Sequence, residues 1–302
     1  MDTFRDRLKV CIETHLNPIC LGIDPHFDEK MLPRFMRKEK SEKGEIALLE
    51  AFTNTLLDAA KGKLPAVKFQ MAFFEACGWQ GVKVLENAIV KAKDAGLLVI
   101  LDAKRGDISS TMAAYGKMAF EKFCADALTV TPYMGYDVIQ PLIPWLKAGK
   151  GVYIVWVSSN PSGSLLQDQY LQAADRTIAE FLLDALQNDF ERDQITESIG
   201  LVLGATKLET LSESTWKLAS NYPLLLPGIG PQGGTYSDKI LTLLKHQTHL
   251  IPISRGIAGV GDVRVADKLN ALTGWDDYHS LIVDNISPIA QYSKIKRFSD
   301  LL

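Results

Sequence analysis

One short segment, residues 101–108, gathers several ionisable side chains in the order Leu-Asp-Ala-Lys-Arg-Gly-Asp-Ile. Asp102 and Lys104 are separated by a single residue, and Asp107 follows shortly after them. Side chains at positions i and i+2 of a β-strand point to the same face, so Asp102 and Lys104 are expected to emerge side by side. An alternation of lysine and aspartate keeps the lysines protonated and holds them rigidly.

Two further charged residues, Lys68 and Asp24, fit the same alternation of lysine and aspartate. Lys68 lies between Val67 and Phe69, which is a poor environment for an unpaired charge. Asp24 ends another apolar run. A structural salt-bridge network that fixes strand register is the alternative explanation, and for a single ion pair it would be preferred. Several charges that converge at strand ends favour a functional site instead.

The elements that would position these residues are short apolar runs, each followed by a longer segment. The runs are 18–23, 66–70, 97–101, 127–131, 152–157, 200–204, 224–228 and 250–254. Runs of this length, bounded by Gly, Pro and polar residues, are typical of buried parallel strands. Helical spacing of apolar residues recurs between them, over 46–60, 79–95, 110–124 and 170–187.

Eight strands that alternate with helices predict an α/β protein with a single (β/α)8 TIM barrel, formed by residues 1–302 as one catalytic domain. A doubly wound sheet is the alternative. No Gly-x-Gly-x-x-Gly follows the first run, where a dinucleotide-binding fold would have it.

Two segments interrupt the alternation. Residues 28–45 are rich in charges of both signs, which predicts a solvated loop or a short surface helix. Residues 160–194 form a long connection that could carry a mobile loop over the site.

Glycine-rich turns follow the seventh and eighth runs, at 227–234 and 254–259. The loops after these two strands commonly bind phosphate in (β/α)8 barrels. Glycine lets backbone N–H groups turn toward an anion, and Arg255 can bind it with two hydrogen bonds. The sequence therefore predicts a substrate that carries a phosphate monoester.

Ser158 and Ser159 follow the fifth run, where either hydroxyl could bind substrate or cap the strand.

The composition excludes other functions. A net charge of -3 and a pI near 6.0 give no global attraction to nucleic acid or to an anionic membrane. The charged N-terminus is unlike a signal peptide, and the apolar runs are too short to span a bilayer, so we expect a cytoplasmic protein. The cysteines and histidines lack metal-ligand spacing, and no metal is expected.

The segment from Asp102 to Thr111 resembles the signature of the orotidine 5′-phosphate decarboxylase family, Asp-x-Lys-x-x-Asp-Ile-x-x-Thr, at every fixed position. The stretches 22–25, 67–70 and 227–234 also fall where that family has them, so the resemblance covers nearly the whole chain. The chain length and the stretch 72–75 are similar to the longer, type 2 branch.

The resemblance implies cofactor-independent decarboxylation of orotidine 5′-monophosphate to UMP and CO2, the last step of de novo pyrimidine nucleotide synthesis. Lys104 would protonate C6 of the pyrimidine, and Asp102 would lie beside the substrate carboxylate. Lys68 would hold the array together and bind the ribose. Asp107 and Thr111 would reach the active site of the partner subunit in a homodimer.

The remaining roles concern binding of the nucleotide. Asp24 would accept a hydrogen bond from a ribose hydroxyl, and Ser158, or else its neighbour Ser159, would recognise the base. Gln232 and Arg255 would hold the phosphate. Further substrate contacts are implied at Ile108, Gly233 and Gly256.

Two other functions compete with this interpretation. Related barrels such as hexulose-phosphate synthase and ketogulonate-phosphate decarboxylase share the Asp-x-Lys-x-x-Asp core but use Mg²⁺, so a chelator would abolish their activity. A non-catalytic nucleotide-phosphate binding protein with this fold is the second alternative. The alternation of Lys68, Asp102, Lys104 and Asp107 argues against it, because a binding protein needs no such array.

Overall fold

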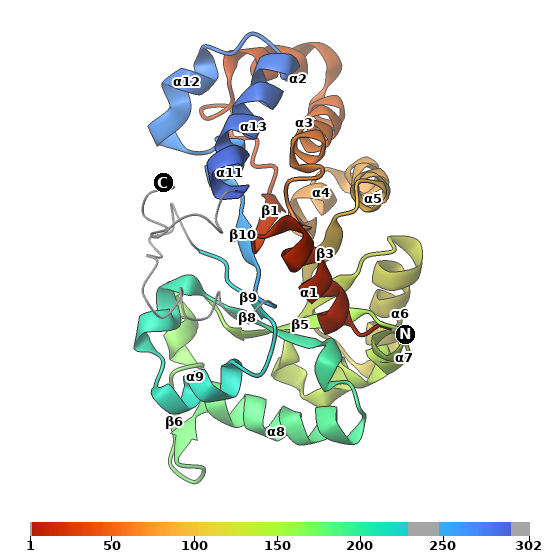
Figure 1. Ribbon diagram of the computed structural model, residues 1–302, viewed down its shortest axis with the longest axis vertical. Coiled ribbons are helices and arrows are strands. Elements are labelled where there is room, and N and C mark those ends of the chain that lie inside the picture. The colour runs from red at the N-terminus through yellow and green to blue at the C-terminus, as the bar shows by residue number, and fades with distance from the viewer. Residues whose placement is uncertain (1, 229–247, 291–302) are drawn as a thin grey trace. The chain divides into compact units, whose positions relative to one another are not determined.

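The computed structural model describes residues 2–228 and 248–290, and Figure 1 shows the path of the chain. The strands of its main sheet are β1 (Ile19–Ile23), β2 (Ala66–Gln70), β3 (Leu98–Arg105), β4 (Ala127–Val130), β5 (Gly151–Val157), β8 (Ile199–Leu203), β9 (Leu224–Leu225) and β10 (Ile251–Ile253). Each predicted apolar run overlaps one of these strands.

The sheet has the strand order β10-β1-β2-β3-β4-β5-β8-β9, and the recorded pairs within it are parallel. A parallel bridge between Leu225 and Leu250 also joins β9 to the residue that precedes β10. The strand order therefore returns to its start, as in a (β/α)8 barrel, which confirms the predicted fold class.

Helices alternate with these strands. The α-helices are α1 (Phe4–His15), α2 (Arg34–Lys43), α3 (Glu45–Ala60), α4 (Met71–Glu75), α5 (Gly78–Asp94), α6 (Ser109–Gly116), α7 (Ile143–Lys147), α8 (Ile178–Arg192), α9 (Glu213–Ala219), α11 (Arg255–Ala258), α12 (Ala266–Asn270) and α13 (Trp275–Ala290). A π-helical segment, η1 (Lys117–Lys122), continues α6, and short 3-10 turns occupy 132–134, 136–138, 140–142, 161–165, 196–198, 205–210 and 263–265. Within the two described ranges, no helix combines the length and apolar character needed to cross a membrane.

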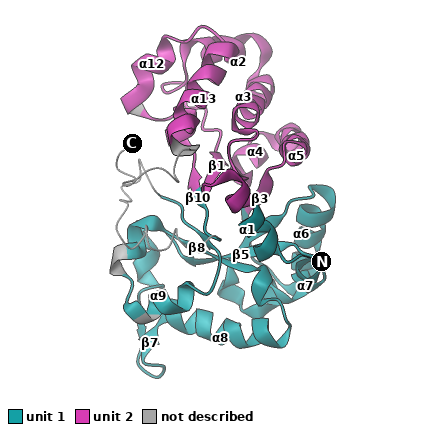
Figure 2. Ribbon diagram, viewed as in Figure 1, with its two compact units in different colours: residues 1–10, 103–251 teal, residues 11–102, 252–302 magenta. Residues whose placement is uncertain are grey.

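The chain divides into two compact units, coloured separately in Figure 2. One comprises residues 11–102 and 252–302, and helices α3 and α13 pack in it through aromatic rings. Phe52 and Tyr278 stack with 6.1 Å between their ring centroids. Their burial contributes to the core of this unit.

The other unit comprises residues 1–10 and 103–251. Its core contains Tyr153 and Trp156 of β5, both almost fully buried. The Phe4 ring packs edge-on against Tyr153, with 5.7 Å between the ring centroids. Added side-chain atoms at Gly151 would collide with Phe4, so a glycine is required where β5 begins.

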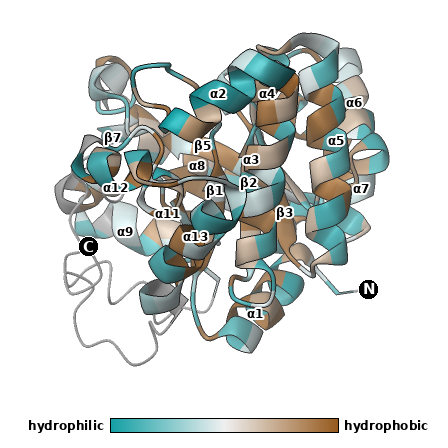
Figure 3. Cartoon of the chain, turned by 90° about the horizontal axis from the view of Figure 1, so that it is seen from above, coloured by the Kyte–Doolittle hydropathy of each residue, from teal (hydrophilic) through white to brown (hydrophobic). Residues whose placement is uncertain are grey.

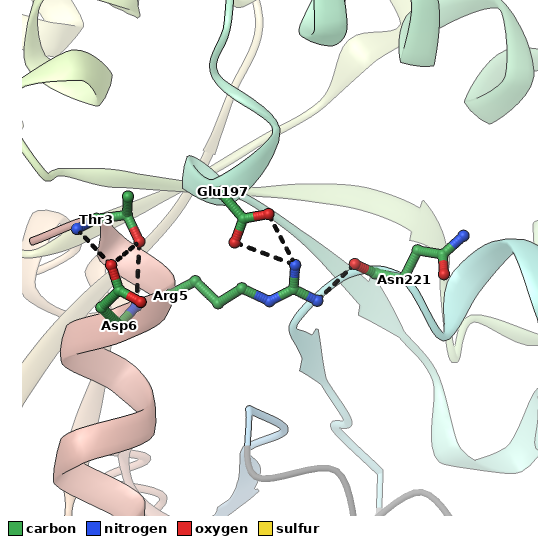
Figure 4. A network of polar contacts seen from close by, with 5 residues as sticks. All are labelled: Thr3, Arg5, Asp6, Glu197 and Asn221. Carbon is green, nitrogen blue, oxygen red and sulfur yellow. Dashed lines mark hydrogen bonds and ion pairs between the residues drawn. The ribbon is translucent and has the colours of Figure 1, made fainter.

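Charged contacts fasten the start of α1 to this unit, as Figure 4 shows. The Arg5 guanidinium donates to both carboxylate oxygens of Glu197 at 3.1 Å and to the Asn221 carbonyl oxygen at 2.6 Å. Arg7 donates to the buried Asp126 carboxylate at 3.0 Å. These bonds hold the amphipathic N-terminal helix in place.

The predicted helix over 170–187 is wrong in its first turns. A two-stranded antiparallel hairpin, β6 (Tyr170–Leu171) with β7 (Arg176–Thr177), comes first, and α8 starts only at Ile178. Thr177 and Glu180 form a capping box, which stabilises the helix start at that position.

The charged segment 28–45 contains α2, a short helix in which only Met36 is buried. Most of the α2 ribbon has the hydrophilic colour in Figure 3. One of the two predicted forms, a short surface helix, is therefore confirmed.

Candidate functional site

An ion cluster joins Lys68 in β2, Asp102 in β3 and Asp24, which directly follows β1. The Lys68 ammonium lies 3.2 Å from Oδ1 of Asp24 and 3.1 Å from Oδ2 of Asp102. The side chains of Lys68 and Asp102 are only 7% and 8% exposed, against 30% for Asp24. The predicted pairing of these charges is therefore present in the structure.

The electrostatic balance of the cluster keeps Lys68 charged. Burial by itself lowers the pKa of Lys68, but the negative charges of Asp24 and Asp102, together with their hydrogen bonds, hold that pKa above its ordinary value. The cluster therefore presents a fixed positive charge between two carboxylates at neutral pH.

Removing this ammonium should destabilise the fold. In the Lys68→Met variant, the buried Asp102 would lose the Lys68 ammonium, and we expect the free energy of unfolding to fall by about 3–5 kcal/mol. Denaturant unfolding measures the change. The matched control is Lys83→Met, which breaks an exposed 2.8 Å pair with Glu86 and should cost about 0–1 kcal/mol. Equal losses in the two variants would contradict this account of the cluster.

Gln70 is a member of this cluster that the sequence interpretation missed. Its Nε2 donates to Oδ2 of Asp102 at 3.2 Å, and the two residues are partners in the parallel register of β2 and β3. The available signal was its position, two residues after Lys68 on the same strand, which puts both side chains on one face.

Lys104, near the end of β3, departs from regular strand geometry. Its φ is 47°, in the left-handed region, which costs a residue with a side chain about 1–2 kcal/mol. That Asp102 and Lys104 emerge side by side stays a prediction. Such a backbone outlier is a reason to suspect a functional role.

The motif residues after Lys104 form a tight turn into α6. Oδ1 of Asp107 accepts a hydrogen bond from the N–H of Ile108 at 2.7 Å, and Ile108 precedes the first residue of the helix. A side chain at Gly106 would meet the Thr131 carbonyl oxygen at 2.7 Å, so only glycine fits there. Thr111 lies in the first turn of α6, half-buried.

Ser158 directly follows β5, as predicted. Both its backbone N–H and its hydroxyl contact Oε1 of Gln167, at 3.1 Å and 3.4 Å. Gln167 was not recognised from the sequence, because it lies in the 160–194 connection before the helical spacing that begins at residue 170. A substrate that binds the Ser158 hydroxyl would therefore either displace Gln167 or bind beside it.

Arg255 and Gly256 begin α11 directly after β10 and Ser254, and both are half-buried. Gln232 and Gly233 lie outside the described residues. Among the residues described, no group of three or more His, Cys, Asp or Glu side chains is arranged to hold a metal ion.

Comparison with known proteins identifies the family. Residues 17–269 match the model of the Orotidine 5'-phosphate decarboxylase / HUMPS family. A Streptomyces coelicolor protein named orotidine 5'-phosphate decarboxylase is 36% identical over 262 residues, covering 85% of this chain and 90% of the relative. A Salinispora arenicola protein of the same name is 38% identical over 242 residues, covering 79% and 83%.

Solved structures agree on the fold. A Streptomyces avermitilis protein, described as a candidate orotidine 5'-phosphate decarboxylase, has a TM-score of 0.73 and 30% identity, covering 97% of this chain and 96% of its own. The Leishmania donovani OMP decarboxylase has a TM-score of 0.66 and 28% identity, covering 93% and 99%. The chain therefore belongs to the orotidine 5′-phosphate decarboxylase / HUMPS family and is an enzyme of the carboxy-lyase class.

Proposed function

We propose that this enzyme converts orotidine 5′-monophosphate to UMP and CO2 without a cofactor, as the last step of pyrimidine nucleotide synthesis. The relatives that cover most of the chain carry the name of this activity. The observation that carries the proposal is the Asp24–Lys68–Asp102 cluster, because Asp102 lies in β3 two residues before Lys104 of the family motif.

The chemistry explains why charges are needed at this strand. In decarboxylation the bond between C6 and the carboxyl carbon breaks, and its electron pair stays on C6 while CO2 leaves. The resulting carbanion at a vinyl carbon has little resonance stabilisation. A fixed ammonium from Lys104 supplies positive charge where negative charge develops, and then gives its proton to C6.

The other charges of the array support this step. Asp102 beside the substrate carboxylate raises the energy of the bound substrate, and that repulsion disappears as CO2 leaves. Lys68, held between Asp24 and Asp102, fixes the array and binds the ribose, with Asp24 accepting from a ribose hydroxyl. Ser158 recognises the base, and Ile108 contributes a further substrate contact.

Phosphate binding belongs to Arg255 in this proposal, with Gly256 beside it and Gln232 and Gly233 from the preceding loop. The Arg255→Ala variant should lose at least about 1.5 kcal/mol of UMP binding, roughly tenfold in affinity, because a charge-assisted hydrogen bond is removed. Wild type and Arg255→Ala should bind uridine, which lacks the phosphate, with the same affinity. Isothermal titration measures both ligands, and Arg34→Ala, at an exposed arginine of α2, is the control. Equal loss for UMP and uridine would refute the phosphate role.

We further propose a cytoplasmic homodimer of single-domain subunits, in which Asp107 and Thr111 complete the partner's site. The exposure of apolar side chains near them supports a contact there. Ile108, Tyr133 and Met134 are 64%, 78% and 58% exposed, and they follow β3 and β4. An exposed apolar group of this kind is typical of a subunit interface.

A magnesium-dependent barrel of the same family is the second candidate, because the family model also covers it. The two candidates make opposite predictions about a chelator, which the closing experiment of the Discussion uses.

A further inference from the structure

The backbone of Lys104 is bound by two threonine side chains. Its N–H donates to Oγ1 of Thr129, with 2.9 Å between the atoms. Its carbonyl oxygen accepts a hydrogen bond from the Thr131 hydroxyl at 3.4 Å. Thr129 lies in β4 and Thr131 directly follows that strand, so both threonines come from the neighbour of β3 in the sheet.

This arrangement coincides with the left-handed φ of 47° at Lys104. Residues with a side chain seldom adopt such a conformation, and they keep it only when the surrounding structure holds them there. The hydroxyl of Thr129 satisfies an N–H that has left regular strand geometry. Thr129 is fully buried, so water cannot take the place of its hydroxyl.

The conformation matters because φ sets the direction in which the side chain leaves the backbone. Rotation about the N–Cα bond swings Cβ relative to the preceding strand, so a change from 47° to an ordinary strand value would redirect the whole lysine side chain. At Arg105, the residue after Lys104, the backbone carbonyl oxygen accepts a hydrogen bond from the N–H of Thr131 at 2.7 Å. The pairing of β3 with β4 is therefore tight around Lys104.

We propose that Thr129 is a positioning residue for Lys104, which holds its backbone in the conformation that aims the ammonium at C6. The inference rests on the proposed function, in which Lys104 donates the proton. A displacement of about 1 Å at a reacting group can lower a rate about 100-fold, which sets the size of the expected effect.

The experiment compares Thr129→Val, which keeps the shape but removes the acceptor, with Thr129→Ser, which keeps the hydroxyl. We expect kcat for orotidine 5′-monophosphate to fall roughly 10–100-fold in Thr129→Val, with UMP affinity within about twofold of wild type. Thr129→Ser should keep kcat within about threefold of wild type. A purely structural role would lower UMP affinity and thermal stability together with kcat.

Thr53→Val is the matched control. Thr53 is also fully buried, in α3, and its hydroxyl has no hydrogen-bond partner among the described residues. We expect this variant to match wild type in kcat and in UMP affinity. An effect in Thr129→Val would then come from the Thr129 hydroxyl itself and not from a general effect of removing a buried hydroxyl.

The outcomes separate the two proposals. A wild-type protein without decarboxylase activity overturns the proposed function and this inference with it. An active wild type with an unchanged kcat in Thr129→Val, or with kcat and UMP affinity falling in parallel, overturns the inference alone. If Thr129→Val does not fold, Thr129→Ala carries the test. A lower kcat with unchanged UMP affinity then supports the positioning role, and an unchanged kcat refutes it.

Discussion

Replacing Lys104 by alanine should lower kcat/KM for orotidine 5′-monophosphate at least about 10³-fold while UMP binding stays measurable. The substitution removes the proton donor together with the positive charge next to the developing carbanion. General acid catalysis alone contributes about 10²–10⁴-fold, and electrostatic stabilisation adds to it. UMP already carries the C6 proton, so its binding does not require that step.

Steady-state kinetics and UMP titration of the same samples measure this prediction. Lys117→Ala is the control, because Lys117 is an exposed lysine that follows α6, outside the motif. We expect its kcat/KM to equal that of wild type. Substantial turnover by Lys104→Ala would contradict the assignment of the proton donor and leave the decarboxylase activity of the wild type unaffected.

Mixing two inactive variants should restore activity if Asp107 serves the neighbouring subunit. Lys104→Ala lacks the proton donor, and Asp107→Asn lacks the contributed carboxylate. A hybrid dimer would combine both defects in one site and leave the other site with neither. With random exchange, half of the dimers are hybrids, so about a quarter of wild-type activity should return.

The measurement is the activity of an equimolar mixture after unfolding and refolding together. Each variant refolded alone serves as the baseline. If Asp107 acted within its own subunit, every site of a hybrid would retain one defect and the mixture would stay inactive. Light scattering on the same samples reports the dimer directly, and Tyr133→Asp should weaken it by burying a charge at the proposed interface.

The strands and the ion cluster were predictable because their signals are local. Apolar runs bounded by glycine and proline located the strands, and Lys68 between Val67 and Phe69 had to find a negative partner once it was buried. Neighbouring parallel strands end at the same edge of a sheet, so Asp24 and Asp102 were the residues within reach.

The features that were missed depend on tertiary contacts. Nothing in the segment Ala103-Lys104-Arg105 indicates a left-handed φ, because that conformation is held by Thr129 from the next strand. Gln167 reaches Ser158 from the part of the 160–194 connection that precedes the helical spacing. The hairpin before α8 carries helix-forming residues, and strand pairing and the capping box at Thr177 override that preference.

The most direct test of the central claim is to mix the purified protein with orotidine 5′-monophosphate in chelator-treated buffer. Ultraviolet absorbance follows the loss of substrate, and chromatography follows the formation of UMP. We predict that substrate disappears, that one UMP forms for each substrate consumed, and that the rate is the same with and without the chelator. No loss of substrate in the metal-free buffer would contradict the account, and activity that returns only with Mg²⁺ would favour the magnesium-dependent members of the family.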